Sequence, residues 1–423
     1  MRRGSILISG AGIAGPALAY WLRRHGFTPA LVERAPAPRP GGQAIDIRGA
    51  AREVAERMGI MSALRANHTG THGIAYVDSK GRRQATIGGD DFGDSGGVVA
   101  EIEILHGDLV RILHEAAGAD IEYIYGDMIT GLAEDGNGVE VSFANGPIRR
   151  FDLVVGADGL RSGVRSLAFG PDSEFIRDLG YYSTYFSART NLKLDGWEIM
   201  YNLPAGNGVG GRVAMLYPLG DTGQIRAMFA FRSPELSYDR RDVQAQKDIL
   251  TKVYGGAGWE LPGLLDQLRR SDDLYFARVG EVRVDQWSRG RTVLLGDSAY
   301  GGSLGMGTSM ALVGAYVLAG ELAAAKGDHR IAFAAYEKEM REYVAINQKR
   351  PPGSDRGFAP NTAGGICMRN QIVRIMTHLP GKQKMMGNMQ RDANAISLKD
   401  YEKDHELTSG GRAAATIGRR SVG

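Results

Sequence analysis

The first 33 residues contain the feature that most restricts how this chain can fold. A short apolar run, SILIS at residues 5–9, leads into the glycine-rich turn GAGIAG and then into a helical pattern over residues 13–25. A second apolar run, PALVE at residues 29–33, follows that pattern. A strand, a glycine turn, a helix and a second strand in this order predict a βαβ unit, which begins a parallel α/β sheet.

Three glycines and one glutamate give this unit the spacing of a dinucleotide site. Gly10 permits the tight turn, Gly12 lets a pyrophosphate approach the backbone, and Gly15 lets the helix pack against the strand. The free N–H groups at the helix N-terminus suit phosphates. Glu33 ends the second strand, where a carboxylate binds ribose hydroxyls. A second glycine-rich copy, GNGVGG at residues 206–211, precedes a strand instead of a helix, and we interpret it as a hairpin loop.

Two more motifs place an aspartate directly after a predicted strand. The strand FDLVV at residues 151–155 leads to Asp158, and the strand TVLLG at residues 292–296 leads to Asp297. A glycine-rich loop and a long helix from about residue 308 follow Asp297. A carboxylate at such a strand end can accept hydrogen bonds from ribityl hydroxyls, and the helix can direct its positive end at a flavin ring.

The middle of the chain has a different pattern. Alternating, aromatic-rich runs over residues 180–232 predict an antiparallel sheet. Its aromatic and methionine side chains are the candidates for contact with a hydrophobic ligand: Tyr185, Met200, Met215, Tyr217, Met228 and Phe229. The alternation of side chains along a strand places Met215 and Tyr217 on one face together.

Composition excludes several classes of function. Lys and Arg number 51 against 48 Asp and Glu, so the net charge of +3 predicts no nucleic-acid partner. The single cysteine, Cys367, excludes an internal disulfide and suits a reducing cytoplasm. The apolar stretch MALVGAYVLAG is short, so we expect no membrane span. His68 and His72 flank a glycine-containing segment, and we expect no metal site there.

Taken together, GAGIAG with Glu33, the pair Asp158-Gly159 and the pair Gly296-Asp297 resemble the flavin monooxygenases of the p-hydroxybenzoate hydroxylase type. The segments AYWLRRHGF, GGQAIDIRG, EIEILHGDLVRIL and LVGAYVLAGEL are most similar to the tetracycline-inactivating members of that family. The resemblance covers about residues 5–350.

The resemblance implies an α/β fold with a discontinuous domain organisation. A Rossmann-like (GR2-type) FAD-binding domain would comprise residues 1–72, 101–176 and 272–345. An inserted antiparallel-sheet substrate domain would comprise residues 73–100 and 177–271. C-terminal helices would span residues 346–404, and the Gly/Ala/Arg/Ser-rich end at residues 405–423 predicts a disordered tail.

The same resemblance implies FAD as cofactor and NADPH or NADH as reductant. In the family, reduced flavin and O₂ form a C4a-hydroperoxide that hydroxylates an aromatic or polycyclic substrate. We therefore expect a hydrophobic, polyketide-like small molecule as partner, a role in natural-product tailoring or antibiotic inactivation, and a monomer or weak dimer. The residues carried over as cofactor-binding are Gly10, Gly12, Ala14, Gly15, Glu33, Arg34, Arg48, His106, Asp158, Asp297, Gly305 and Gly307; Arg48 is also the one candidate catalytic side chain.

Two departures from the family pattern keep other hypotheses open. His106 stands where the family usually has an arginine, and the loop SAYGGSLGMG after Asp297 is two residues shorter, with Met306 in place of a glutamine. One alternative is a non-redox flavoprotein that uses FAD as a scaffold for a cyclisation, such as a [4+2] reaction in polyketide biosynthesis. Another is a protein that sequesters an aromatic drug. Ser303 matches G-x-S-x-G, but it lies too far past its strand for a hydrolase elbow.

Overall fold

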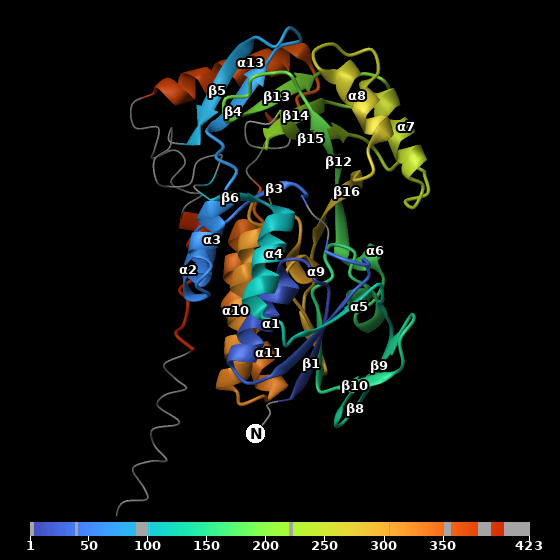
Figure 1. The fold of residues 1–423 in the computed structure, drawn as a ribbon, viewed down its shortest axis with the longest axis vertical. Coiled ribbons are helices and arrows are strands. Elements are labelled where there is room, and N and C mark those ends of the chain that lie inside the picture. The colour runs from blue at the N-terminus through green and yellow to red at the C-terminus, as the bar shows by residue number, and fades with distance from the viewer. Residues whose placement is uncertain are drawn as a thin grey trace, which may run out of the picture.

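The computed structural model describes residues 4–38, 41–89, 100, 102–219, 223–303, 305–350, 357–379 and 391–401. The predicted tail at residues 405–423 therefore lies outside the described residues. Two sheet-based halves stand one above the other in Figure 1, and helices cover both.

A six-stranded sheet organises the lower half, in the order β17-β18-β11-β1-β2-β7. The neighbours from β18 to β7 pair in parallel, and β17 pairs antiparallel with β18. The strands are β1 (Ser5–Ser9), β2 (Thr28–Glu33), β7 (Glu122–Tyr125), β11 (Leu153–Gly156), β17 (Ser288–Arg289) and β18 (Thr292–Leu294). The predicted βαβ start and both later strands are thus confirmed as parts of one sheet.

Most helices of this half bury apolar residues in the core around the six-stranded sheet. Helix α10 contacts α1, α2 and α11, and α1 also contacts α4. The helices of this half are α1 (Ala14–Arg24), α2 (Ala50–Arg57), α3 (Met61–Ala66), α4 (His106–Ala117), α5 (Gly163–Ala168), α6 (Asp172–Phe175), α9 (Asp297–Tyr300), α10 (Gly307–Ala324) and α11 (His329–Asn347). Two small antiparallel sheets complete it: β8 (Ile129–Asp135), β9 (Gly138–Phe143) and β10 (Arg149–Phe151), and β3 (Ala44–Asp46) with β6 (Glu103–Leu105).

A seven-stranded sheet organises the upper half, in the order β16-β12-β15-β14-β13-β4-β5 (Figure 1). All neighbours pair antiparallel except β13 and β4, which are parallel. The strands are β4 (Gly73–Val77), β5 (Arg83–Gly88), β12 (Ile176–Arg189), β13 (Trp197–Leu203), β14 (Arg212–Pro218), β15 (Gln224–Arg232) and β16 (Tyr275–Val282). Strand β16 belongs to this sheet, although the predicted division placed residues 272–345 with the FAD-binding segments.

The two faces of this sheet carry separate cores. Helices α7 (Val243–Tyr254) and α8 (Leu261–Arg270) cover one face. Helix α13 (Ala363–His378) packs against β5 and β13, and its Val373 joins the core of the other face. The loop GNGVGG joins β13 to β14 and closes on itself at Gly206 and Val209, so its interpretation as a hairpin loop is confirmed.

The C-terminal helical segment returns to the lower half after α13. The Tyr401 hydroxyl donates to Glu321 on α10 at 2.8 Å. Its ring fills the notch left by Gly320, where a Cβ atom would lie 2.2 Å from the ring. This contact ties the end of the described chain to α10 in the lower half.

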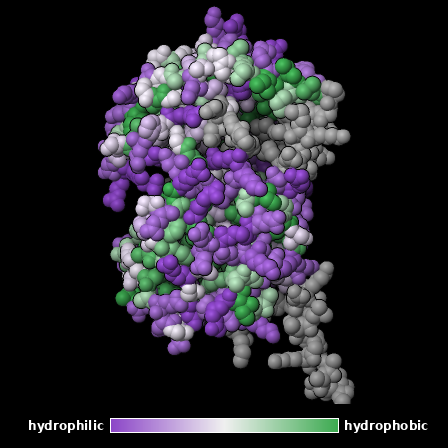
Figure 2. Space-filling model, turned by 180° about the vertical axis from the view of Figure 1, so that it is seen from behind, coloured by the Kyte–Doolittle hydropathy of each residue, from purple (hydrophilic) through white to green (hydrophobic). Residues whose placement is uncertain are grey.

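Helix α10 corrects the expectation that no apolar stretch is long enough to cross a membrane. It has 18 residues, and among the described helices it alone meets that test by length and composition. However, 83% of it is buried inside the molecule. Hydrophilic side chains dominate the face seen in Figure 2, and the hydrophobic ones there form small separate patches.

Candidate functional site

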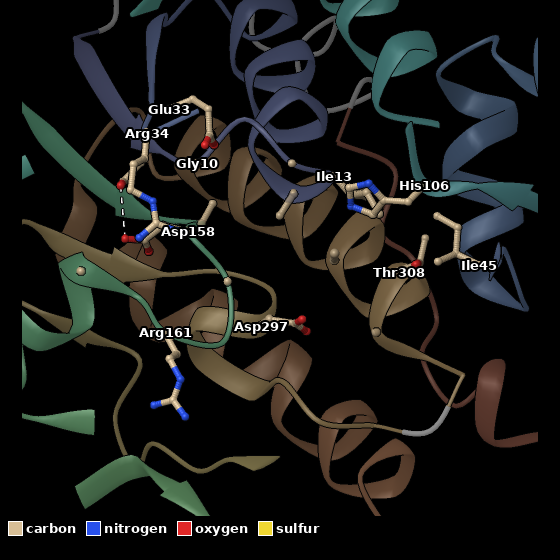
Figure 3. Close-up of a pocket in the computed structure, with 18 of the residues that line it drawn as sticks. Gly10, Ile13, Glu33, Arg34, Ile45, His106, Asp158, Arg161, Asp297 and Thr308 are labelled. Atoms are coloured by element: carbon tan, nitrogen blue, oxygen red, sulfur yellow. Dashed lines mark hydrogen bonds between the residues drawn. The ribbon is translucent and has the colours of Figure 1, made fainter. Parts of the chain in front are cut away.

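A cavity of about 620 Å³ opens where the parallel strands of the lower sheet end. Figure 3 shows Glu33 and Arg34 at one end of it, Asp297 near its middle, and His106, Ile45 and Thr308 at the other end. Ten of the twelve residues predicted to bind the cofactor line it: Gly10, Gly12, Ala14, Glu33, Arg34, His106, Asp158, Asp297, Gly305 and Gly307. Segments far apart in sequence therefore meet at one site, as strand-end sites in α/β sheets do.

The three glycines of GAGIAG differ in what surrounds them. Gly10 has φ +105°, and a Cβ atom there would lie 2.4 Å from the Ala157 carbonyl oxygen. A Cβ atom on Gly15 would lie 2.0 Å from the Gly10 carbonyl oxygen, so Gly15 fixes the contact between helix and strand rather than the cavity wall. At Gly12 a Cβ atom would meet no protein atom within 4 Å. Because Gly12 has no side chain and no protein atom lies near, the space at the N-terminus of α1 stays open beside it.

Glu33 is held in place by backbone donors. Its Oε2 accepts from the Ala11 N–H at 3.0 Å, and its Oε1 accepts from the Ala35 N–H at 2.8 Å. Each carboxylate oxygen retains a lone pair for a further donor. The Glu33 carboxylate is therefore a fixed hydrogen-bond acceptor at one end of the cavity. This is the residue that the sequence motif predicts to bind a ribose.

Asp158 follows β11 on the cavity wall and links this strand to the ends of β1 and β18. It accepts hydrogen bonds from the hydroxyls of Ser162, Ser9 (3.2 Å) and Ser298 (3.2 Å). Ser9 is the last residue of β1, and Ser298 is the second residue of α9. Neither serine was predicted from the sequence to belong to the site. Arg165 is fully buried and donates to the Ser298 carbonyl at 2.9 Å, so it supports this junction and lies on no solvated face.

Asp297 is the first residue of α9, directly after Gly296 with φ +65°. Its side chain is exposed to the cavity that it lines. The surrounding protein atoms raise the pKa of Asp297, because desolvation disfavours the charged carboxylate. Ser303, set aside from the sequence as a loop residue, also lines the cavity, and its hydroxyl is buried without a partner among the described residues.

These features fit FAD. The cavity lies in the volume range of cofactor sites, a helix N-terminus without an acidic first turn opens into it, and Gly12 leaves room for a pyrophosphate. The unpartnered Ser303 hydroxyl and the Asp297 carboxyl supply polar contacts toward the opposite end.

Arg48 does not line the cavity, in contrast to the expectation that it lies beside the flavin. Its guanidinium pairs with Asp46 at 2.8 Å, and its backbone N–H donates to the Ser309 hydroxyl at 3.0 Å. Asp46 does line the cavity, so Arg48 lies one layer behind the wall. His106 lies on the wall itself, at the start of α4, and its N–H donates to Gln43 at 2.9 Å.

Five of the six side chains predicted to contact a hydrophobic ligand lie on one face of the seven-stranded sheet: Tyr185, Met200, Met215, Tyr217 and Met228. Strand register aligns Tyr76, Met200, Met215, Met228 and Tyr185 across five adjacent strands. We call these five residues the methionine row. Tyr185, at one end of the row, also lines the cavity, so the row and the cavity meet there.

Phe229 is a wrong prediction. Neighbouring residues on a strand point to opposite faces, so Met228 and Phe229 cannot both face the same ligand. Phe229 is fully buried in the core beneath α7 and α8, with its ring 4.5 Å from that of Tyr254.

A buried pair of carboxyls beside the methionine row was not found from the sequence. Glu198 on β13 and Glu103 on β6 are 3% and 7% exposed and are hydrogen-bonded to each other. The hydroxyls of Thr69 and Thr71 donate to Glu103 at 2.6 and 2.9 Å. Burial raises the pKa of both carboxyls, and the charge of Glu103 raises that of Glu198 further. Of the two carboxyls, Glu198 therefore has the pKa that is raised further above its ordinary value.

Among the residues that the structure describes, no three His, Cys, Asp or Glu side chains gather in a metal-binding group. The His72 N–H donates to the Gly196 carbonyl at 2.6 Å, and His68 pairs across a bridge with Ile104.

Residues 3–346 match the protein family described as "FAD binding domain", so the chain belongs to that family. Within it, this protein is a flavin-dependent monooxygenase. It is 37% identical over 403 residues to a flavin-dependent monooxygenase from an unknown prokaryotic organism, which covers 94% of this chain and 98% of that one. It is also 30% identical to the FAD-dependent monooxygenase asL4 of Sarocladium schorii, over 88% of this chain and 92% of that one.

A solved structure gives the same result. The crystal structure of the tetracycline destructase Tet(51) superposes with a TM-score of 0.79 at 33% identity and covers 94% of this chain and 99% of that one. The predicted family, the α/β fold with an FAD-binding domain and the monooxygenase function are thereby confirmed.

Proposed function

We propose that this enzyme takes electrons from NADH or NADPH and inserts one oxygen atom of O₂ into a planar aromatic or polycyclic small molecule. The observation that carries the substrate class is the methionine row, an apolar and polarisable set of largely buried side chains whose end residue, Tyr185, lines the cavity that fits FAD. The tetracycline destructase Tet(51), a solved structure similar to this chain, supports the same substrate class. The cytoplasm is the proposed location, in keeping with the single free cysteine.

FAD, when bound, would take two electrons from the reduced nicotinamide and activate O₂, so that one oxygen atom enters the substrate and the other leaves as water. The chain's own residues would bind and orient. Glu33 and Gly12 would hold the ribose and pyrophosphate end, and Asp297 with Ser303 would contact the ring end. Desolvation raises the pKa of Asp297, which favours its protonated form more than in a free aspartate.

The methionine row would exclude water from one face of the substrate. Three thioethers adapt to irregular ring systems, because methionine has flexible torsions and contacts aromatic rings favourably. Helix α13 closes the outer part of this face: Arg369 lies 4.1 Å over the ring of Tyr76 and donates to Asn202 at 2.6 Å. A substrate bound there would be shielded from solvent on the side away from the cofactor.

The test is an anaerobic titration of the FAD-loaded enzyme with NADH and NADPH, followed by admission of air with a panel of polycyclic phenols. We expect the flavin absorbance to bleach, then to recover with a product 16 mass units heavier than the substrate. A flavin that stays oxidised with every reductant would overturn the proposal, and a cyclised product of unchanged mass would favour the scaffold hypothesis. Recovery of intact ligand without consumption of reductant would indicate sequestration.

A further inference from the structure

Arg226 lies where the substrate sheet meets the wall of the cofactor cavity. It is two residues before Met228 on β15 and therefore shares its face. Register places Arg226 between Tyr217 on β14 and Ser187 on β12, one row below the methionine row. A charged side chain in this position is unusual, because Arg226 is only 5% exposed.

The guanidinium of Arg226 has partners on both halves of the molecule. Its Nε donates to the Gly42 carbonyl at 2.9 Å, across to the cofactor half. Its Nη1 donates to the Ser187 hydroxyl and pairs with Asp273, both within the upper half. A planar guanidinium can serve these partners at once, which a lysine ammonium at the end of a flexible chain does less well.

Asp273 keeps this arrangement charged. Burial opposes its ionisation, but hydrogen bonds from Ser187, Ser271 and Arg226 together hold the pKa of Asp273 well below its usual value. The carboxylate therefore remains an anion at any pH at which the protein functions, and the buried cation stays paired.

The segment that Arg226 holds is the glycine pair before β3. Gly41 and Gly42 have φ +73° and +93°, a conformation that glycine adopts readily. A Cβ atom on Gly41 would lie 3.2 Å from the guanidinium, and one on Gly42 would lie 2.9 Å from the Cβ of His106. The segment is thus enclosed between Arg226 and α4, with no room for a side chain.

The same segment then forms part of the cavity wall. Residues 43–46 line the cavity immediately after Gly42. The Gly41 and Gln43 carbonyls accept the N–H groups of Gly107 and His106 at 2.6 and 2.9 Å, which fixes the segment on the α4 side. On the side of the substrate sheet, Arg226 supplies the contact through the Gly42 carbonyl.

We propose that Arg226 is a positioning residue that sets the wall of residues 41–46 against the flavin from the substrate sheet. Loss of its contact would free the Gly42 carbonyl and loosen the wall while the α4 contacts remain. The cofactor would then be held less tightly although no residue that touches it has changed. This inference shares with the proposed function the binding of FAD in the cavity, but it depends on neither reductant nor substrate.

The experiment compares FAD release from three full-length holoenzyme variants, followed by flavin fluorescence on dilution, together with the visible spectrum of the bound flavin. In Arg226→Gln we expect release to be roughly tenfold faster, the size of one lost hydrogen bond to a charged group, with a shifted flavin band. Arg226→Lys retains the charge but has a single donor nitrogen in place of the planar guanidinium, so we expect an intermediate rate of FAD release. Arg278→Gln is the matched control, because Arg278 lies on β16 of the same sheet and pairs with Asp178 and Glu235 instead of the cofactor half.

Melting temperatures separate this role from a general loss of stability. The proposal requires faster FAD release in Arg226→Gln than in Arg278→Gln, with the Lys variant between them. An Arg226→Gln holoenzyme that releases FAD at the wild-type rate and has the wild-type flavin spectrum would overturn the proposal, whatever its melting temperature. If the Gln variant does not fold, the Lys variant decides: a wild-type rate and spectrum there would equally overturn the proposal.

Discussion

The cofactor cavity and the methionine row use the chain in different ways. The cavity is built from backbone groups and short side chains at strand ends, held by local turns such as Gly10 and Gly296. The methionine row is built from side chains on five strands and depends on their pairing register. A change at the cavity should therefore act on FAD with little effect on the fold, whereas a change in the row should act on substrate with little effect on FAD.

The largest expected effect is on FAD. In Gly12→Val the new side chain would meet no protein atom near its Cβ, so the protein should fold, yet it would fill the space reserved for the pyrophosphate. We expect FAD affinity to fall by roughly 100-fold or more, as expected for the loss of several charge-assisted hydrogen bonds. Flavin fluorescence titration measures this, with the melting temperature of the apoprotein as the check on folding.

Gly15→Val is the contrasting variant. Its Cβ would lie 2.0 Å from the Gly10 carbonyl oxygen, so it should unfold or fail to express. A Gly12→Val protein that purifies fully yellow would contradict the assignment of the cavity.

The next largest expected effect is on the KM for substrate. Met228→Ala removes the methionine that lies beside Tyr185 in the methionine row. It should raise the KM for a polycyclic substrate about tenfold, in line with the loss of one large buried contact. FAD affinity should stay unchanged. Phe229→Leu, one residue away on the opposite face, should lower stability and leave KM near wild type. Equal effects of the two variants on KM would mean that the row does not bind substrate.

A smaller effect concerns the carboxyl pair. Folding raises the pKa of Glu198, so its contribution to stability is fully present below the unfolded pKa and is lost as pH rises toward the folded value. Glu198→Gln retains the shape without a titrating group. We expect the melting temperature of wild type to fall relative to the variant by ~2 °C or more between pH 5 and pH 9. Parallel curves would show that Glu198 does not stay protonated in the folded protein.

The smallest expected effect is that of Tyr185→Phe. The Tyr185 hydroxyl is hydrogen-bonded to Ser183, while its ring supplies the apolar contact at the end of the row. We expect less than a threefold change in KM, measured in the same assay as the methionine variants. A loss as large as that of Met228→Ala would show that the hydroxyl, and not the ring, contacts substrate.

The same contrast explains what the sequence could predict. Ten of the predicted cofactor residues line the cavity. Those in local motifs such as GAGIAG or Gly296-Asp297 could be predicted because the geometry of these motifs follows from spacing, whereas Arg34 and His106 came from the family resemblance. Arg48 was misplaced because its partner Asp46 takes the wall position, and spacing does not say which of two neighbours faces a cavity. The prediction for Phe229 was wrong because Phe229 and Met228 are neighbours on β15, and side chains of neighbouring residues point to opposite faces of a sheet. Glu103 and Glu198 could not be paired from the sequence, since strands of different sheets bring them together.

The most direct test of the central claim is the source of the oxygen in the product. The enzyme, loaded with FAD and given NADPH or NADH and a polycyclic phenol that it consumes, is run under ¹⁸O₂ in ordinary water, and the product is analysed by mass spectrometry. We predict one ¹⁸O atom in the product, with the second oxygen atom lost as water. A product with no ¹⁸O, or one that gains oxygen only from labelled water, would contradict the assignment of this protein as a monooxygenase that acts on such substrates.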